Sequence, residues 1–101
     1  MPYSYLKHEE NVDISAGLEV VITIGRTPHV TFFEFLARSS SPTTFIVEAS
    51  ADGETWLTKR EIPDVSEFYY SCYNVCPYLR FRILPSAGAT ATYLIVGGTL
   101  S

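Results

Sequence analysis

Histidine and cysteine are the side chains best suited to nucleophilic and metal chemistry, and this 101-residue chain holds two of each. A serine or cysteine nucleophile needs a histidine base within hydrogen-bonding reach, and a third group that orients the base. His8 lies in a charged N-terminal segment, and His29 begins an expected strand directly after Pro28. Neither histidine lies in a nucleophile motif. We therefore expect no catalytic residues and predict that the chain is not an enzyme.

Cys72 and Cys76 are separated by three residues, and this spacing leaves their state open. In an extended strand their Cα atoms would lie about 13 Å apart, beyond the reach of a disulfide. A turn at residues 73–75 would bring them closer, and Asn74 favours such a turn. Free thiols are the favoured interpretation and a disulfide is the alternative. A zinc site would need more ligands nearby, and the acids are too dispersed for calcium, so we expect no metal and no cofactor.

A tyrosine-rich segment is the first candidate for binding. Strand alternation would place Tyr69 and Tyr73 on one face, and Phe68 and Tyr70 on the other. Tyrosine rings stack on sugars, and they also anchor protein interfaces. The predicted ligand or interface residues are Tyr3, Tyr5, Leu6, Tyr69, Tyr70, Tyr73, Tyr78, Arg80 and Arg82.

Arg80 and Arg82 are two residues apart, so a strand would place both on one face. The favoured interpretation of this pair is a cross-strand ion pair with Glu48 or Glu67. The alternative is that the two guanidinium groups contact a ligand or a partner.

The elements that must position these residues are strands. Alternating apolar residues predict strands at 18–24, 29–38, 43–50, 56–62, 67–73, 77–83 and 89–97. Turn residues separate them at 25–28, 39–42, 52–53, 63–64 and 88. Asp52 and Gly53 are expected to form a tight turn with a positive φ at the glycine. Trp56 is expected to be largely buried and structural.

Seven strands at spacings of about ten residues are typical of a sandwich or barrel. We predict an all-β, antiparallel, two-sheet sandwich resembling a jelly roll, with seven to eight strands. The eighth would lie within residues 1–16, which form either an N-terminal arm or an edge strand. Residues 17–101 form the predicted sandwich domain.

The composition predicts association. Hydrophobic residues make up 47% of the chain and charged residues only 18%, while a domain of this size buries only about 60–65% of its unfolded surface. The surplus is expected at a subunit interface, so a homo-oligomer or larger protein assembly is favoured over a monomer with ordinary exposed aromatics. The net charge of −4, without a basic stripe, argues against nucleic acid. Neither a signal peptide nor a membrane-spanning run is visible, so synthesis in the cytoplasm is expected and the final location stays open.

Residues 43–84 resemble one family in part. The pattern consists of Phe45, Val47, Ser50, Asp52, Gly53 and Trp56, followed by Tyr78, Leu79, Arg80, Phe81, Arg82 and Ile83. This layout is similar to that of discoidin-type, galactose-binding-like sandwiches, including the short forms found in bacterial and phage structural modules. The resemblance implies a sandwich fold. Discoidin domains are longer and bind ligand through long end loops that are cut to a few residues here, so lectin activity is less strongly implied.

Two functions follow from these expectations. The first is a structural, self-associating subunit, such as a virion decoration or coat protein or another surface-assembly protein. Its connector would be the N-terminal arm, whose Tyr3, Tyr5 and Leu6 would dock on a neighbouring copy. The alternative is a small carbohydrate-binding module that uses Tyr69, Tyr70, Tyr73 or Trp56 as a stacking platform.

Overall fold

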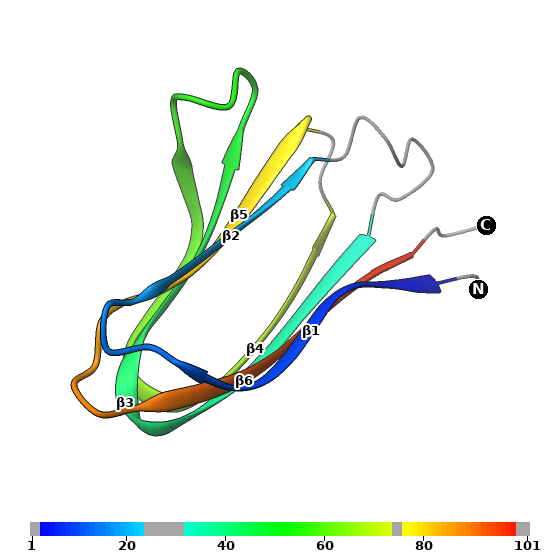
Figure 1. Cartoon of the computed structure of the whole chain (residues 1–101). Coiled ribbons are helices and arrows are strands. Elements are labelled where there is room, and N and C mark those ends of the chain that lie inside the picture. Colours follow the sequence, from blue (N-terminus) through cyan, green and yellow to red (C-terminus); the bar gives the residue numbers. More distant parts are fainter. Residues whose placement is uncertain (1–2, 24–31, 74–75, 99–101) are drawn as a thin grey trace.

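The structure, a computed structural model, describes residues 3–23, 32–73 and 76–98, with side chains from residue 6 onward. Within these residues the chain forms six strands: β1 (Tyr3–Asp13), β2 (Leu18–Thr23), β3 (Phe32–Ser50), β4 (Leu57–Tyr73), β5 (Tyr78–Ile83) and β6 (Thr90–Gly98). All pairings are antiparallel. Figure 1 shows the strands as one sheet that curls strongly back on itself into a half-barrel.

The long strand β3 joins the two halves of this sheet. Its residues 32–39 pair with β6, and its residues 45–50 pair with β5. Beyond them lie β1 and β2, which gives the order β1-β6-β3-β5-β2, while β4 follows the other side of β3. We call β1, β6 and the adjoining residues 32–39 and 67–73 the first half. The second half comprises β2, β5 and residues 45–50 and 57–62.

The predicted two-sheet sandwich of seven to eight strands is therefore wrong. The chain is all-β and antiparallel, but its strands are hydrogen-bonded into one sheet. Strand β3 continues through the expected loop at 39–42, and strand β4 continues through the expected strand end at 63–64. The extra residues are accommodated as bulges, because the register between β3 and β4 shifts between Arg38 and Thr43 and again before Phe45. Such bulges bend a strand without ending it, and they tolerate proline.

Local hydrogen bonds explain how polar residues lie in the bend of β3. The Ser39 hydroxyl donates to the carbonyl of Ser41 at 2.6 Å, and the Thr43 hydroxyl donates to the carbonyl of Leu84 at 2.8 Å. Both side chains are buried, and a buried hydroxyl without a partner would be costly. In β4 the irregularity falls near Asp64, which has a φ of 56°. These residue types indicated loops, yet here they serve as bulges.

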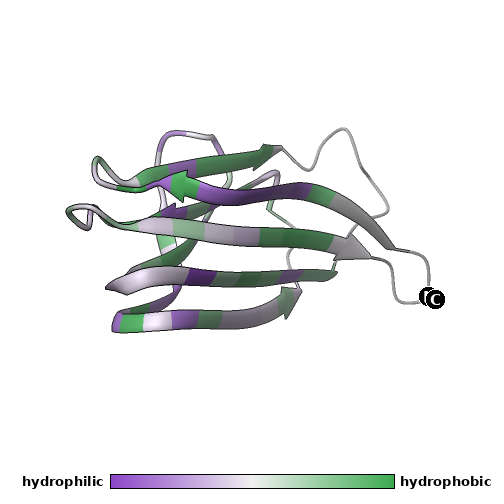
Figure 2. Ribbon diagram, turned by 60° about the horizontal axis from the view of Figure 1, so that its bottom comes forward, coloured by the Kyte–Doolittle hydropathy of each residue, from purple (hydrophilic) through white to green (hydrophobic). Residues whose placement is uncertain are grey.

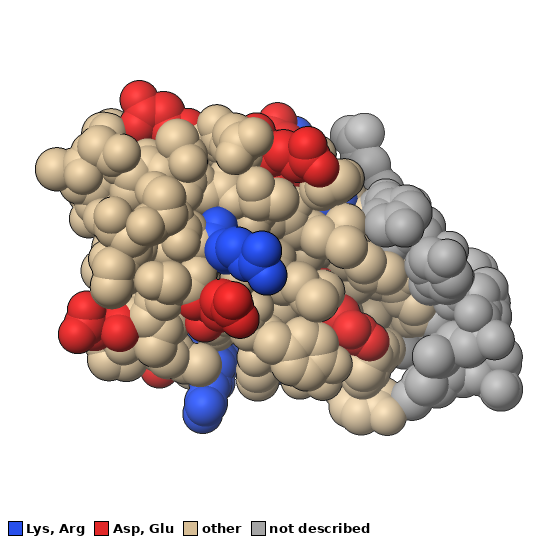
Figure 3. Space-filling view, turned by 90° about the horizontal axis from the view of Figure 1, so that it is seen from below, with Lys and Arg blue, Asp and Glu red and all other residues tan. Residues whose placement is uncertain are grey.

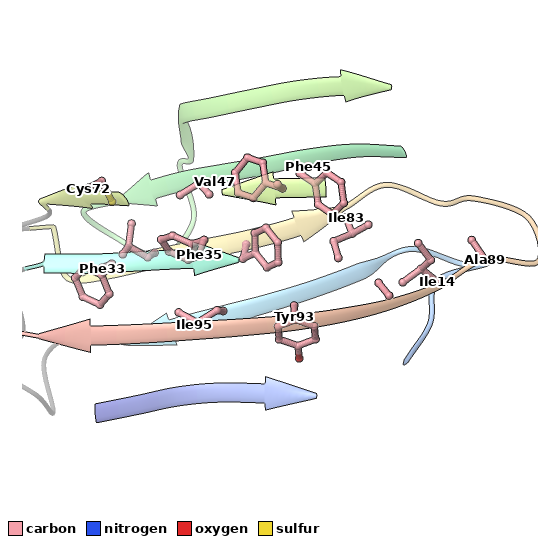
Figure 4. Close-up of a cluster of buried hydrophobic side chains, with 14 residues drawn as sticks. Ile14, Phe33, Phe35, Phe45, Val47, Cys72, Ile83, Ala89, Tyr93 and Ile95 are labelled. Atoms are coloured by element: carbon pink, nitrogen blue, oxygen red, sulfur yellow. The ribbon is translucent and has the colours of Figure 1, made fainter. Parts of the chain in front are cut away.

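The core fills the hollow of the curl (Figure 4). Burial alternates along most strands, so alternate side chains point inward. Figure 2 shows hydrophobic and hydrophilic residues interspersed along the ribbons. Phe33 and Phe35 of the first half and Phe45 and Val47 of the second are fully buried. The other members of the buried cluster are Ile14, Phe68, Cys72, Leu79, Phe81, Ile83, Ala89, Ala91, Tyr93 and Ile95.

Phe81 on β5 connects the two halves through ring contacts. Its centroid lies 5.7 Å from that of Phe35 and 6.0 Å from that of Tyr93, both in the first half. It also lies 5.8 Å from Phe68 and 6.4 Å from Phe45. Aromatic pairs in this distance range add to the energy of burial. The curl is thus held closed by side chains as well as by the continuous strands.

The N-terminal residues belong to the sheet. Strand β1 lies at the sheet edge, and its residues 3–13 pair with β6. Leu6 was expected to dock on a neighbouring copy, but it packs against the core of its own chain. The side chains of Tyr3 and Tyr5 lie outside the described residues, as do His29, Asn74 and the predicted turn at 25–28. No helix in the described part of the chain is long and apolar enough to cross a membrane.

Candidate functional site

The outer surface of the first half exposes a group of apolar side chains. Leu36 on β3 lies directly between Tyr69 on β4 and Leu94 on β6, so the three side chains form a row across the sheet. Tyr69 and Tyr73 are 59% and 61% exposed, and Leu36 is 36% exposed. We call this surface the aromatic face and define it by Phe32, Leu36, Tyr69, Tyr73, Leu94 and Val96.

The rings of the aromatic face are held in place by their neighbours. Tyr73 packs edge-on against Phe32, with ring centroids 5.2 Å apart. The Tyr69 hydroxyl donates a long hydrogen bond, 3.4 Å, to the carboxylate of Glu34. Both tyrosines lie on a regular stretch of β4 paired with β3, which fixes the backbone that carries them.

A shallow groove of about 620 Å³ crosses this face. Leu36, Tyr69 and Leu94 contribute apolar surface, and His8, Arg38 and Glu67 contribute polar groups. The Arg38 guanidinium lies 3.6 Å from the Glu67 carboxylate in an exposed ion pair. Figure 3 views the molecule from below, where acidic and basic groups are scattered over a largely uncharged surface and one basic group adjoins an acidic one. The groove can therefore accept a partner that is mainly apolar with a few polar groups.

The outer surface of the second half is polar and internally paired. Glu48 is only 7% exposed, and its Oε1 lies 2.9 Å from Arg80 Nε and 3.5 Å from Arg82 Nη1. Glu19 approaches each arginine at 3.9 Å. The Trp56 ring covers the Arg80 guanidinium at 4.2 Å from the ring centroid. We call Glu19, Glu48, Trp56, Arg80 and Arg82 the ionic cluster.

Four of the predicted binding residues are engaged in contacts within the chain. Arg80 and Arg82 are engaged by Glu48, the cross-strand partner that strand pairing suggested. Tyr78 is half-buried, and its ring packs close to Gly53. A Cβ added at Gly53 would lie 3.4 Å from the Tyr78 ring. Tyr70 packs toward Phe68, and burial raises the pKa of its hydroxyl. Among the described candidates, Tyr69 and Tyr73 are the two that face solvent.

Trp56 has a structural role, as expected. It was predicted to be largely buried, and it is partly buried just before β4, although it is not part of the core cluster. Its contact with Arg80 is a cation–π interaction, which favours a guanidinium over a sugar as the neighbour of this ring. Trp56 therefore does not offer an open stacking platform.

The groups with nucleophilic or metal chemistry are dispersed. Cys72 is buried and no disulfide joins it to Cys76. Burial raises the pKa of the Cys72 thiol, which lowers its reactive thiolate fraction. His8 is exposed on β1, with its Nε2 3.7 Å from the Glu10 carboxylate. Within the described chain, no group of three or more histidine, cysteine or acidic residues is arranged to hold a metal ion.

Sequence alternation found the tyrosines of the aromatic face but missed its aliphatic members. Leu36, Leu94 and Val96 alternate outward on their own strands, and this was visible in the sequence. What the sequence lacked was the pairing of β3 with β6, which places Leu36 beside Leu94. Strand alternation assigns a face, but it does not identify the neighbouring strand.

The fold resembles several solved structures, while no family model and no curated protein matches the sequence. The PBSX exported protein XepA superposes with a TM-score of 0.69 at 12% identity, over 99% of this chain and 38% of XepA. The Yersinia pseudotuberculosis-derived mitogen gives 0.54 at 10% identity, over 99% of this chain and 87% of the mitogen. The C-terminal domain of a Bacteroides fragilis chitobiase gives 0.52 at 12% identity, over 98% and 95%.

These likenesses are too low in identity to show more than the fold, and this chain spans well under half the length of XepA. They correct the resemblance to discoidin domains. The shared pattern at residues 43–84 reflects a tight turn and alternating strands, which one curled sheet also contains. The chain is a small all-β domain with a curled antiparallel sheet similar to those of XepA and the Yersinia mitogen.

Proposed function

We propose that this chain is a non-enzymatic structural subunit that associates with copies of itself through the aromatic face. The observation that carries the proposal is the exposure of Tyr69 and Tyr73, at 59% and 61%, beside Leu36 on a rigid sheet. Contiguous apolar surface is uncommon on soluble monomers and often marks an interface. Tyrosine is also enriched at the centres of protein interfaces.

The charges around the aromatic face favour a second copy as its partner. A two-fold interface brings one patch against the same patch of the other subunit, so a patch with an excess of one sign would repel itself. Here Arg38 and Glu67, which have opposite charges, pair with each other in the next row of the same face, beside Leu36 and Tyr69. Two copies related by a two-fold axis can exchange these partners, so that Arg38 of each faces Glu67 of the other.

Such a subunit suits a layer built from many copies, as in a virion coat or decoration shell or another surface assembly. The fold likeness to an exported protein of PBSX supports this setting only at the level of fold. The N-terminal arm is no longer the natural connector, because β1 is part of the sheet. Deleting it would open an edge along β6, so an arm deletion is a poor test of assembly.

The test is sedimentation of Leu36→Ser beside a matched control, Leu57→Ser. Leu57 is 72% exposed and lies on β4 in the second half, away from the aromatic face. We expect the wild type and the control to form the same oligomer, and Leu36→Ser to weaken it at least about tenfold. A wild type that stays monomeric at its highest soluble concentration, or an unchanged oligomer in Leu36→Ser, would refute the proposal.

The same tyrosines support a second candidate function, carbohydrate binding. Tyr69 and Tyr73 lie on one face of β4, about 13 Å apart at the rise of an extended strand, and the groove beside Tyr69 holds the polar groups of His8, Arg38 and Glu67. Sugars combine stacking on rings with hydrogen bonds to such groups. Glycan-array binding that is lost in Tyr69→Ala and retained in Trp56→Phe would favour this function. Absence of glycan binding by the monomer would exclude it.

A further inference from the structure

Three strands of the sheet have one side without a strand partner in the described chain: β1, β2 and β4. An open edge presents unpaired backbone N–H and C=O groups, and proteins usually protect it with charges, proline or bulges. On β1 the residues from Lys7 to Glu10 are charged or ionisable, and the register shifts twice. This edge is therefore protected.

The edge of β4 is protected as well. It contains Pro63 and a positive φ at Asp64, and its register with β3 shifts three times. The Lys59 ammonium donates to the Tyr73 carbonyl at 3.0 Å, which satisfies one backbone group near the end of the strand. These features make β4 a poor template for a further strand.

Strand β2 has neither a proline nor a bulge, and it has a single charged residue. Its six residues pair with β5 in an unbroken register, and Glu19 is the charged residue. The Glu19 carboxylate is engaged on the outer surface by Arg80 and Arg82, at 3.9 Å from each. The remaining residues are apolar apart from Thr23.

The side chains of β2 are less buried than those of β5, as expected for a strand that lacks a neighbour on one side. Its inward residues Leu18, Val20 and Ile22 pack against the core, yet all three are only partly buried. The inward residues of the next strand, β5, are at most 1% exposed. On the outer surface Val21 is 49% exposed. A strand added beside β2 would shield both sets of side chains.

We propose that β2 pairs antiparallel with β2 of a second copy, so that the sheet continues across a two-fold axis. With Val21 opposite its counterpart, Val20 lies opposite Ile22 and Glu19 lies opposite Thr23. This register keeps inward residues beside inward residues, as the strand period requires. It also places no two like charges opposite each other.

This interface is independent of the aromatic face, because it lies on the other half of the sheet. Its affinity comes from main-chain hydrogen bonds together with apolar side chains, as in other cases of strand addition. A subunit with two separate two-fold interfaces links more than two copies. The pair of interfaces would therefore turn a dimer into a larger assembly.

The experiment compares Val21→Lys with Leu57→Lys, since both wild-type side chains are exposed and both changes add the same charge. Two lysines meeting at the two-fold axis would repel each other, and lysine on an edge discourages pairing. We expect Val21→Lys to raise the dissociation constant of the β2 dimer at least about tenfold, and Leu57→Lys to leave it unchanged. Sedimentation in the Leu36→Ser background isolates this dimer from association through the aromatic face.

Hydrogen exchange provides a second measurement that needs no substitution in β2. Pairing would protect the backbone amides of residues 18–23 that point away from β5. Their hydrogen exchange should therefore slow as protein concentration rises. Exchange that is independent of concentration, or an unchanged dimer in Val21→Lys, would overturn the proposal. Loss of all association in Leu36→Ser alone, with no protection of β2, would overturn it while supporting the proposed function. Protection of β2 that survives in Leu36→Ser supports β2 pairing whatever the fate of the aromatic face.

Discussion

The outer surfaces of the two halves of the curled sheet differ in how far their side chains are exposed and paired. In the second half, Glu48 is 7% exposed and engages Arg80 and Arg82. In the first half, Tyr69 and Tyr73 are about 60% exposed and contact few groups. Both surfaces belong to one sheet and share one core, so the fold does not impose the difference.

The contrast separates residues that complete the fold from residues available to a partner. The ionic cluster satisfies its own charges, and Trp56 covers the guanidinium that would otherwise attract a ligand. The aromatic face keeps more than half of the surface of Tyr69 and Tyr73 accessible. The sequence made Arg80, Arg82 and Tyr69 binding candidates, although it favoured an ion pair with Glu48 or Glu67 for the two arginines. Their contacts show that the arginines are occupied within the chain.

The largest expected effect concerns the core that the two halves share. Phe81 is fully buried and contacts rings from both halves. Phe81→Ala should lower the free energy of unfolding by about 3–5 kcal/mol, the usual cost of deleting a buried aromatic ring. Urea denaturation measures this, with the exposed Leu57→Ala as a control that should change by less than about 0.5 kcal/mol. Separate unfolding transitions of the two halves would show that they do not form one cooperative unit.

The next prediction compares one ion pair from each half. Glu48→Gln leaves Arg80 and Arg82 in a largely desolvated cluster, with only Glu19 at 3.9 Å to offset them. Breaking a buried pair costs about 3–5 kcal/mol, and the partial exposure of Arg82 reduces our expectation to about 2 kcal/mol.

The matched control is Glu67→Gln. Its pair with Arg38 is 74% and 77% exposed, so the change should be below about 0.5 kcal/mol. Equal losses of stability in the two variants would contradict the distinction between the halves.

Much of this contrast was visible in the sequence, and the rest depended on long-range pairing. Alternation placed Tyr69 and Tyr73 on one face and Phe68 and Tyr70 on the other, and the structure shows that the first pair faces solvent. It also placed Arg80 and Arg82 together on one strand face. These inferences are local, since they need only the period of a strand.

Two other features could not be predicted from the period of a strand. Serines and a proline at 39–42 are typical of a loop, and only the partner strands make them a bulge within β3. The pairing of β3 with β6 on one side and β4 on the other depends on contacts distant in sequence. Without that order, two sheets and one curled sheet share the same alternating pattern. The prediction of a sandwich was wrong for this reason.

A smaller effect is expected at the turn that ends the second half. Gly53 has a φ of 81°, and a Cβ there would meet the Tyr78 ring at 3.4 Å. Gly53→Ala should destabilise by about 1 kcal/mol, because L-residues are disfavoured in this conformation. Gly88→Ala measures the backbone cost alone, since its φ is 69° and no atom lies within 4 Å of the added Cβ. A Gly53→Ala variant as stable as wild type would show that the turn relaxes without cost.

The last prediction concerns the same turn and appears only in acid. The Asp52 carboxylate accepts hydrogen bonds from the backbone N–H groups of Thr55 and Glu54 at 2.7 and 2.8 Å, and from the Ser50 hydroxyl at 3.0 Å. These bonds lower the pKa of Asp52 to about 2, whereas an aspartate in an unfolded chain has a pKa near 3.9.

Because the folded state favours the ionised form, the stabilisation by Asp52 is complete above about pH 4 and is lost as the pH falls through about 2. Asp52→Asn keeps an oxygen acceptor in the turn but does not titrate. The fall in unfolding free energy between pH 4 and 2 should therefore be smaller in Asp52→Asn than in wild type. Denaturation curves across this range measure the difference. Parallel pH profiles would mean that the Asp52 carboxylate has the same pKa in the folded turn as in the unfolded chain. The hydrogen bonds of the turn would then add no stability, and the second half would be stabilised by the ionic cluster and the core.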